Sequence, residues 1–323
     1  MSEGIFTLPP FLVENIVASL SAGDKADWGH DLLGVPRLWH LSLGKGVKVA
    51  VLDSGCDRDH PDLQGAVSVW LDTTNSATGP GDSCGHGTFC CGVIGARRNE
   101  TGVVGVAPEC ELLSIKVLGD DGSGSIDQVV RGIDLALEHR ADIISLSLGT
   151  SSPHPELERV CRKAVAQGTI VVASAGNSGP SLDTVLYPAR YDVVISVGAI
   201  DISKQIARFS SRGKRVDVVA PGVQVYSCYP GGRYAYLSGT SMAAPYVSGI
   251  LALYLSYRRL QEGPQWKEEV LVLKKRLLET AVDLGSPGFD FSYGYGLINP
   301  ESLFQLKESH EANEGQANNP TEV

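Results

Sequence analysis

The stretch Gly239-Thr240-Ser241-Met242-Ala243-Ala244-Pro245 joins a strand-like segment to a long apolar run at residues 247–255. A serine at such a turn is exposed at the end of a sheet and lies at the start of a helix. Free backbone N–H groups and the helix dipole favour negative charge there, which suits a nucleophile whose attack creates an oxyanion. An ordinary helix N-cap is the alternative, since Thr240 and Ser241 are both good capping residues.

The composition and net charge of the chain limit the classes of protein to which it can belong. The 323 residues are 43% hydrophobic, which is enough for one large core or two ordinary domains, and the net charge of −10 argues against a nucleic-acid surface. No run of about 18 apolar residues is present, so we expect no membrane span. The N-terminus lacks an export-signal pattern, and we therefore interpret the seven cysteines as reduced thiols of a cytoplasmic protein.

Strands alternate with helices along the chain, which predicts an α/β fold with a doubly wound, largely parallel sheet in one domain. The predicted strands are 47–52, 112–117, 143–148, 170–173, 193–197 and 216–219. The predicted helices are 89–96, 126–137, 156–167, the run after Ser241, and 267–281.

Both ends of the chain differ in character from this domain. We divide the sequence into an N-terminal extension at 1–20, a main domain at 21–304 and an acidic, polar tail at 305–323 that we expect to be disordered. Residues 15–20 are compatible with a helical turn or two. Lys274-Lys275-Arg276 is interpreted as a solvated helix face.

Four polar residues stand at predicted strand ends or helix starts: Asp53, His86, Asn177 and Ser241. Acyl transfer needs this set, because serine is a weak nucleophile until a base takes its proton, and histidine is the natural base near neutral pH. A carboxylate fixes the imidazole tautomer, and an amide side chain can donate to the oxyanion.

The segment around His86 also admits other interpretations. Cys84, Cys90 and Cys91 cluster around the histidine, so a metal site is an alternative, but the spacing lacks a C-x-x-C pair, which disfavours zinc. Cys90, four residues after His86, is interpreted as a small buried residue rather than a catalytic one.

From residue 24 to residue 304 the chain resembles the subtilisin family (subtilase) of serine proteases. The motifs that carry the resemblance are VAVLDSG at 49–55, GHGT at 85–88, SLG at 147–149, AGN at 175–177 and GTSMAAP at 239–245, with the triad in the subtilisin order. The resemblance implies a subtilisin-like fold and a serine endopeptidase that works through an acyl-enzyme. Asp53 would orient His86, the general base and acid, Ser241 would be the nucleophile, and Asn177 with the Ser241 backbone N–H would form the oxyanion hole.

The resemblance also implies how an extended polypeptide substrate would bind. The two segments that would bracket it as edge strands are Gly122, Ser123 and Gly124 on one side and Ser147, Leu148 and Gly149 on the other. The pocket for the fourth residue before the scissile bond would be lined by Ile126, Val129 and Leu148.

The primary specificity pocket would be built by residues 173–176, among them Ala175 and Gly176, and by the segment before Tyr187-Pro188. The family often has glycine or another small residue at the base of this pocket, where this chain has Leu186. A branched side chain there should shorten the pocket and weaken the preference for large aromatic residues, unless it swings aside.

A Ca²⁺ cofactor follows from the resemblance as well. Asp62 would supply a carboxylate, Asn99 a side-chain oxygen, and Arg97, Thr101 and Val103 backbone carbonyls, an oxygen-only set that suits this ion. A further ligand is expected from the N-terminal segment, with no residue assigned.

The family's weaker cation site would use carbonyls near Ala189, Tyr191 and Val194 together with acidic residues. Asp217 is present, but Arg215 stands where an acid is often found. Because arginine brings positive charge to this position, we expect no cation there.

DSGCDRDHPDL at 53–63 and the missing export signal resemble the intracellular subtilisins of bacteria. That group has a short extension that crosses the active site with a Leu-x-Pro-aromatic motif, and Leu8, Pro9, Pro10 and Phe11 fit it loosely. Proline at or beside the scissile bond removes an N–H and distorts the peptide, so the extension could bind without rapid cleavage. The resemblance predicts an autoinhibited zymogen and a homodimer.

Two other functions remain open. A processing protease or peptide ligase with a single substrate would use the same triad, so substrate profiling separates it from a general endopeptidase. A catalytically silent scaffold that binds peptides is disfavoured by the intact Asp53, His86, Asn177 and Ser241.

Overall fold

The computed structural model describes residues 5–8, 11–17 and 23–305, and its centre is one seven-stranded sheet in the order β10-β9-β8-β7-β3-β5-β4. All neighbouring strands in it pair in parallel. The strands are β3 Lys48–Asp53, β4 Val67–Asp72, β5 Glu111–Lys116, β7 Ile143–Leu146, β8 Ile170–Ser174, β9 Ile195–Ile200 and β10 Val218–Pro221. The predicted doubly wound α/β domain is confirmed.

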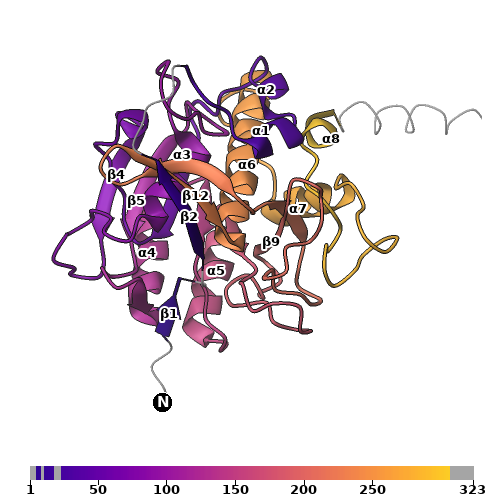
Figure 1. Ribbon diagram of the computed structural model, residues 1–323. Coiled ribbons are helices and arrows are strands. Elements are labelled where there is room, and N and C mark those ends of the chain that lie inside the picture. The colour runs from indigo at the N-terminus through magenta and orange to yellow at the C-terminus, as the bar shows by residue number, and fades with distance from the viewer. Residues whose placement is uncertain (1–4, 9–10, 18–22, 306–323) are drawn as a thin grey trace, which may run out of the picture.

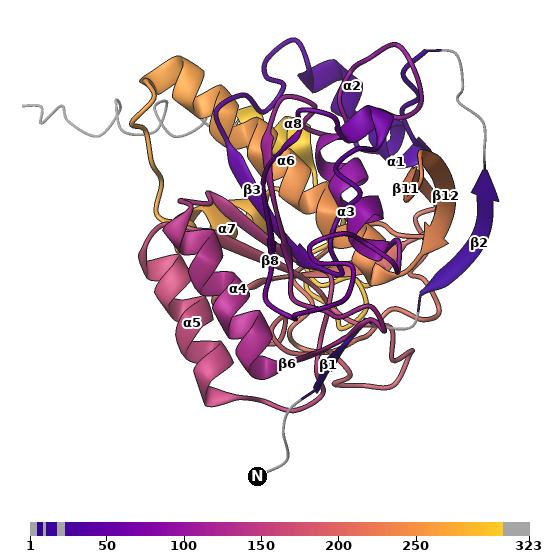
Figure 2. The same ribbon diagram turned by 90° about the vertical axis from the view of Figure 1, so that its left-hand side faces the viewer.

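Helices cover both faces of this sheet (Figure 1, Figure 2). α3 and α6 pack together on one face, and α4 and α5 pack together on the other. The helices are α1 Trp28–Leu32, α2 Val35–Leu38, η1 Pro61–Leu63, α3 His86–Gly95, α4 Ile126–Glu138, α5 Pro155–Ala166, α6 Thr240–Glu262, α7 Val270–Glu279 and α8 Pro300–Gln305. None of the helices in the described ranges combines the length and apolar character that crossing a lipid bilayer needs.

The sequence explains why these layers form. β3 reads as a continuous apolar run because helices cover both of its sides. α6 is buried from Thr240 through Ser256, as expected of a helix with small and apolar residues all round. α4 is amphipathic and starts at a capping box in which Ser125 and Gln128 satisfy each other's backbone N–H groups.

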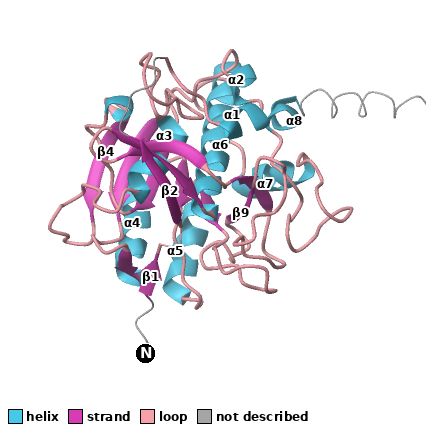
Figure 3. Cartoon of the chain, viewed as in Figure 1, coloured by secondary structure: helices cyan, strands magenta, loops and turns pink. Residues whose placement is uncertain are grey.

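Two smaller sheets lie at the rim (Figure 3). β1 Ile5–Thr7 pairs with β6 Ser123–Ser125, and the second sheet has the order β11-β12-β2, formed by β11 Val225–Tyr229, β12 Arg233–Ser238 and β2 Leu12–Val17. The prediction of a helical turn at residues 15–20 is therefore wrong for residues 15–17, which belong to β2, and residues 18–20 lie outside the described residues. The β-branched residues of β2 favour a strand once β12 offers an edge to pair with.

The domain boundaries predicted from composition stay predictions. Residues 1–4, 9–10 and 18–22 of the extension, and 306–323 of the tail, lie outside the described residues. Gln305, placed in the tail by composition, is the last residue of α8.

Because the strands are parallel, their carboxyl ends meet at one edge of the sheet. β3 ends there at Asp53, β5 ends at Lys116, and β7 and β8 run into the segments of Ser147 and Asn177. The polar residues selected from the sequence therefore gather at this edge.

Candidate active site

Asp53 and His86 form a buried pair at this edge. Nδ1 of His86 lies 2.8 Å from Oδ1 of Asp53, and both side chains are shielded from solvent. The end of β3 and the start of α3 bring them together, and the backbone N–H of Ser54 donates to the same Oδ1 at 2.7 Å. The carboxylate thus holds a proton on Nδ1, which leaves Nε2 as the nitrogen that can accept one.

The pair sets the protonation of His86. Burial is the largest single influence on the His86 imidazole and disfavours its charged form, but the Asp53 carboxylate and the Cys90 side chain together raise the pKa of His86 well above its ordinary value. Burial also raises the pKa of the neighbouring Cys90 thiol to about 11. Cys90 donates through Sγ to the carbonyl of Ser241 at 3.5 Å, so it packs under the histidine as a neutral thiol.

Ser241 is the second residue of α6 and is fully buried. Its Oγ donates to the carbonyl of Ser147 at 3.2 Å, and the Ser147 hydroxyl donates back to the Ser241 carbonyl at 2.9 Å. Nε2 of His86 has no hydrogen-bond partner within the described part of the chain. The three side chains are gathered, but the serine is turned toward Ser147 instead of the histidine.

Asn177 is held at the start of α6 by Thr240. Its Oδ1 accepts the Thr240 backbone N–H at 2.9 Å and the Thr240 hydroxyl at 2.8 Å. Because Oδ1 is bonded to Thr240, the NH₂ group of the Asn177 amide points away from Thr240. Its Nδ2 lies 3.1 Å from the point where a Cβ on Gly239 would stand. An amide donor beside the first turn of a helix suits a developing oxyanion.

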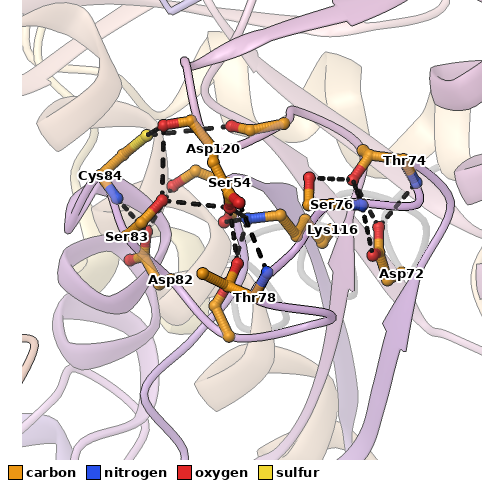
Figure 4. A network of polar contacts seen from close by, with 12 residues as sticks. Ser54, Asp72, Thr74, Ser76, Thr78, Asp82, Ser83, Cys84, Lys116 and Asp120 are labelled. Carbon is orange, nitrogen blue, oxygen red and sulfur yellow. Dashed lines mark hydrogen bonds and ion pairs between the residues drawn. The ribbon is translucent and has the colours of Figure 1, made fainter.

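Asp82, which the sequence analysis did not select, organises the turn before His86 (Figure 4). Its Oδ1 accepts the Ser54 hydroxyl at 2.9 Å, and its Oδ2 accepts both the backbone N–H and the hydroxyl of Thr88. Since the N-cap of α3 is Gly85, which has no side chain, Asp82 supplies the capping oxygens instead. It thereby joins the segment of Asp53 to the helix of His86.

Lys116 is a second residue that the sequence analysis missed. It is fully buried and stands opposite Asp53 in the β3–β5 register. Its Nζ donates to the carbonyl of Ser54 at 2.7 Å and pairs with Asp120 at 3.0 Å, a network visible in Figure 4. A lysine at the end of a largely buried strand that is rich in leucine and isoleucine was the available signal.

The cysteine cluster does not form a metal site of the kind considered above. Cys84 donates to the carbonyl of Asp120 at 3.3 Å, whereas Cys91 is buried. All seven cysteines, each in a described range, are free. Of these residues, His86 and Cys90 lie together with Asp53 in one group of possible metal ligands, which includes neither Cys84 nor Cys91, and the zinc alternative stays untested.

The first described part of the extension pairs with the predicted substrate edges. β1 runs antiparallel to β6, Thr7 forms a bridge with Gly149, and the Leu8 N–H donates to the Gly122 carbonyl at 3.1 Å. Phe6 is fully buried and belongs to the same apolar cluster as the predicted pocket residues Ile126, Val129 and Leu148. The sequence analysis missed Phe6, because its motif began at Leu8.

The extension then reaches the Asp53–His86 pair. Pro9 and Pro10 lie outside the described residues, but Phe11 follows them, and its ring centroid lies 4.8 Å from that of His86. The Cβ of Phe11 also lies 3.6 Å from the point where a Cβ on Gly239 would stand. An aromatic ring of the extension thus covers the histidine next to the start of α6.

Leu186 packs between Gly149 of the predicted substrate edge and Gly176 of the predicted primary pocket. A Cβ added to Gly149 or to Gly176 would stand 2.8 Å from Cδ1 of Leu186. The Leu186 N–H donates to the Ala175 carbonyl at 2.9 Å, which fixes this wall of the pocket. The leucine has not swung aside, and its effect on substrate preference stays a prediction.

The residues predicted to bind Ca²⁺ surround a fully buried carboxylate, Asp62. Its oxygens accept the Asn99 amide at 2.9 Å and the Val103 N–H at 2.8 Å, both neutral donors. Asp24 brings a second carboxylate from the N-terminal side and accepts the Asn99 N–H at 3.0 Å. The partners of both carboxylates named here are N–H donors, and Ca²⁺ binding stays a prediction.

One predicted ligand atom differs in this structure. The side-chain oxygen of Asn99 accepts the backbone N–H of Thr101 at 3.0 Å and does not face Asp62. The Arg97 guanidinium is directed to the carbonyls of Pro108 and Cys110, so its charge is directed away from Asp62.

Lys274 is buried, so its interpretation as part of a solvated helix face was wrong. α7 directs it toward the sheet, where Nζ donates to the carbonyl of Val194 at 2.6 Å and that of Asp192 at 2.8 Å, and pairs with Asp217 at 2.8 Å. These are residues of the weaker cation site, so an ammonium group adds a reason to expect no cation there.

Comparison with known proteins places these residues in context. The model of the subtilase family matches residues 44–296. An intracellular serine protease of Paenibacillus polymyxa is 47% identical over 70% of this chain and 71% of its own length. The major intracellular serine protease of Bacillus subtilis (strain 168) is 40% identical over 87% of this chain and 90% of its own. Subtilisin DY of Bacillus licheniformis is 44% identical over 81% of this chain and 92% of its own.

Replacing Asp53 with asparagine should lower the pKa of His86, because it removes the negative charge that contributes most to the rise against burial. The measurement is an NMR titration of the imidazole in a Ser241→Ala background, which prevents self-cleavage. Ser241→Ala alone is the control and should leave the pKa raised. An unchanged pKa in Asp53→Asn would contradict the assignment of the cause.

The same shift has a consequence for stability. The pKa of His86 in the folded state lies above its value of about 6.5 in the unfolded state. The Asp53–His86 pair therefore contributes its full stabilisation of the folded state below about pH 6.5. The contribution is lost as the pH rises through the folded-state pKa. The loss of unfolding free energy in Asp53→Asn should therefore be largest at acidic pH and should shrink at alkaline pH.

Lys274→Met should destabilise the fold by about 3–5 kcal/mol, because it leaves the Asp217 carboxylate buried without its partner. Thermal unfolding measures this loss. Sodium or potassium chloride should restore more stability to the variant than tetramethylammonium chloride, whose cation is too large for the site. The double variant Lys274→Met, Asp217→Asn should lose less stability, because it leaves no charged carboxylate without a partner. Equal losses of stability in the single and the double variant would exclude the unpaired carboxylate as the cause.

Proposed function

The chain belongs to the subtilase family and is a subtilisin-type serine endopeptidase, and from this premise we propose that Asp53, His86 and Ser241 are its catalytic triad and that its N-terminal extension keeps it a zymogen. The observation that carries the proposal is the Phe11 ring lying against the imidazole of the Asp53–His86 pair.

In the proposed reaction, Ser241 Oγ attacks the carbonyl carbon of the scissile bond while Nε2 of His86 takes the hydroxyl proton. Asp53 stabilises the imidazolium that results. The negative charge that forms on the carbonyl oxygen is received by Asn177 Nδ2 and by backbone N–H groups at the start of α6. The C–N bond then breaks, His86 protonates the departing amine, and water releases the acyl group by the same steps.

Inhibition by the extension follows from the contacts of its described residues. Thr7 and Leu8 occupy the backbone groups of Gly149 and Gly122 that an extended substrate would use. Phe11 covers His86, and Ser241 Oγ is bonded to Ser147 instead of the base. The sequence places two prolines between these contacts, and a residue without an N–H cannot bind there as an ordinary substrate does.

We further propose that Ca²⁺ binds at Asp62, with Asp24 as the N-terminal ligand that the sequence analysis left unassigned. The ion would neutralise the two carboxylates and hold the loop at residues 97–103 against the N-terminal side of the domain. Asn99 would have to present its oxygen in place of its amide nitrogen, which a rotation of the amide achieves.

The location and partners are also proposals. Two of the relatives are named intracellular proteases, and the free cysteines suit a reducing compartment, so we propose a cytoplasmic enzyme. Its partners would be polypeptide substrates and its own extension. A homodimer stays a prediction from the family resemblance.

A form that lacks residues 1–20 should hydrolyse peptides at least tenfold faster than the full chain, and a Ca²⁺ chelator should reduce its activity. Initial rates on a quenched-fluorescence peptide, with and without the chelator, measure both effects. Equal rates for the two forms would exclude the zymogen proposal, and indifference to the chelator would exclude the proposed Ca²⁺ site.

Point variants test the contact that carries the proposal. Phe11→Ala in the full chain should raise basal activity roughly tenfold by uncovering His86, since loss of a buried aromatic contact is worth about that factor. Ile5→Ala is the matched control, because Ile5 also lies in the extension but is 61% exposed. Activation by Ile5→Ala to the same extent would contradict a specific role for Phe11.

Leu186→Gly in the form that lacks residues 1–20 should deepen the primary pocket and favour large substrate side chains. The ratio of kcat/KM for a substrate with phenylalanine before the scissile bond to kcat/KM for one with alanine there should rise roughly tenfold or more. Leu182→Gly is the control, since Leu182 is exposed on the same loop. Unchanged selectivity would show that Leu186 does not limit the pocket.

A further inference from the structure

The turn between β5 and β6 carries one of the two predicted substrate edges. Its first residues, 117–118, donate their N–H groups to the Asp53 carbonyl. Its outer part is closed on itself, because the Gly119 N–H donates to the Ser123 carbonyl at 2.7 Å. Gly122, whose carbonyl accepts an N–H of the extension, lies in this outer part. Contacts with other segments must therefore fix the position of Gly122.

Asp120 makes such contacts from within the turn. Its Oδ1 accepts the hydroxyls of Thr78 at 2.5 Å and Ser83 at 3.1 Å, which both belong to the loop that precedes α3. The same oxygen accepts a hydrogen bond from Nζ of Lys116 at 3.0 Å, as Figure 4 shows. A carboxylate two residues before Gly122 thus ties the outer part of the turn to two other segments at this edge of the sheet.

Lys116 connects this carboxylate to the end of β3. Its ammonium group is fully buried, and its three donors go to the carbonyls of Ser54 at 2.7 Å and Gly81 at 3.0 Å and to Asp120. A buried ammonium group requires a negative partner, which Asp120 supplies. The hydrogen bonds from Thr78 and Lys116 hold the pKa of Asp120 below its usual range, so the carboxylate is charged at neutral pH.

We propose that Asp120 is a positioning residue for substrates that extend along β6, because through Lys116 it holds Gly122 and β6 in register with the Asp53–His86 pair. The proposal rests on the proposed function, in which this edge binds the residues before the scissile bond. It makes the length of the substrate a determinant of the rate. A substrate with four residues before the scissile bond contacts β6 and depends on Asp120, whereas a substrate with one residue there does not reach this edge.

Two p-nitrophenyl esters test the proposal with the form that lacks residues 1–20. They share the residue before the ester bond, and one of them ends there in an acetyl group while the other continues for three further residues. Asp120→Asn should lower kcat/KM for the longer ester roughly tenfold, because a charge-assisted bond to Lys116 becomes a neutral one and the edge is displaced. For the short ester, kcat/KM and its pH profile should stay unchanged, because the Asp53–His86 bond is untouched.

Two further variants sharpen the test. Asp121→Asn is the matched control, because Asp121 is the neighbour of Asp120 but its carboxylate bonds to Ser123 within the turn. It should leave both rates unchanged. Thr78→Val removes a hydrogen bond to the Asp120 carboxylate at an exposed position, where the fold tolerates the change. It should lower kcat/KM for the longer ester in the same direction as Asp120→Asn but by a smaller factor.

The outcomes separate the two proposals. If the form that lacks residues 1–20 cleaves neither ester before any substitution, the proposed function fails. If Asp120→Asn lowers both rates by the same factor, or lowers neither, only the positioning of β6 by Asp120 fails. A loss on the longer ester in Asp121→Asn as large as that in Asp120→Asn would also overturn it, because the bond to Lys116 would then not be the cause.

Discussion

The hydrogen bond between the Asp53 carboxylate and Nδ1 of His86 is the interaction on which the site depends. It exists because a parallel sheet delivers the end of β3 to the same edge as the start of α3. A buried imidazole would ordinarily resist protonation, and the Asp53 carboxylate is the main influence that opposes this effect. Asp82 accepts the hydroxyl of Ser54 and Lys116 donates to the carbonyl of Ser54, so the residue next to Asp53 is held from two sides.

The extension uses the backbone edges that a substrate needs. β1 occupies β6, Thr7 bridges to Gly149, and β2 completes the sheet of β12. In these contacts the extension adds β-strands to existing edges, which is how the proposed function expects a substrate to bind, and the Phe11 ring lies against His86. Edge strands that would otherwise be open to unspecific pairing are therefore covered until the extension is removed.

The sequence was sufficient for the α/β fold and for Asp53, His86, Asn177 and Ser241, because a strand end or a helix start fixes where each of them lies. It was not sufficient for Asp82 or Lys274, whose roles depend on which backbone groups tertiary packing places within reach. Phe6 was missed and β2 was assigned in part to a helical turn for a related reason. Short segments such as β1 and β2 take their structure from the strands with which they pair, here β6 and β12.

The central claim is that Ser241 is the nucleophile and that the extension, which covers His86, keeps it from reacting. The rate of labelling by a serine-directed phosphonate, with the modified residue identified by mass spectrometry, tests both parts in one measurement. The account predicts rapid labelling of Ser241 in the form that lacks residues 1–20 and slow labelling in the full chain. Equal rates in the two forms, or a label on any other residue, would contradict it.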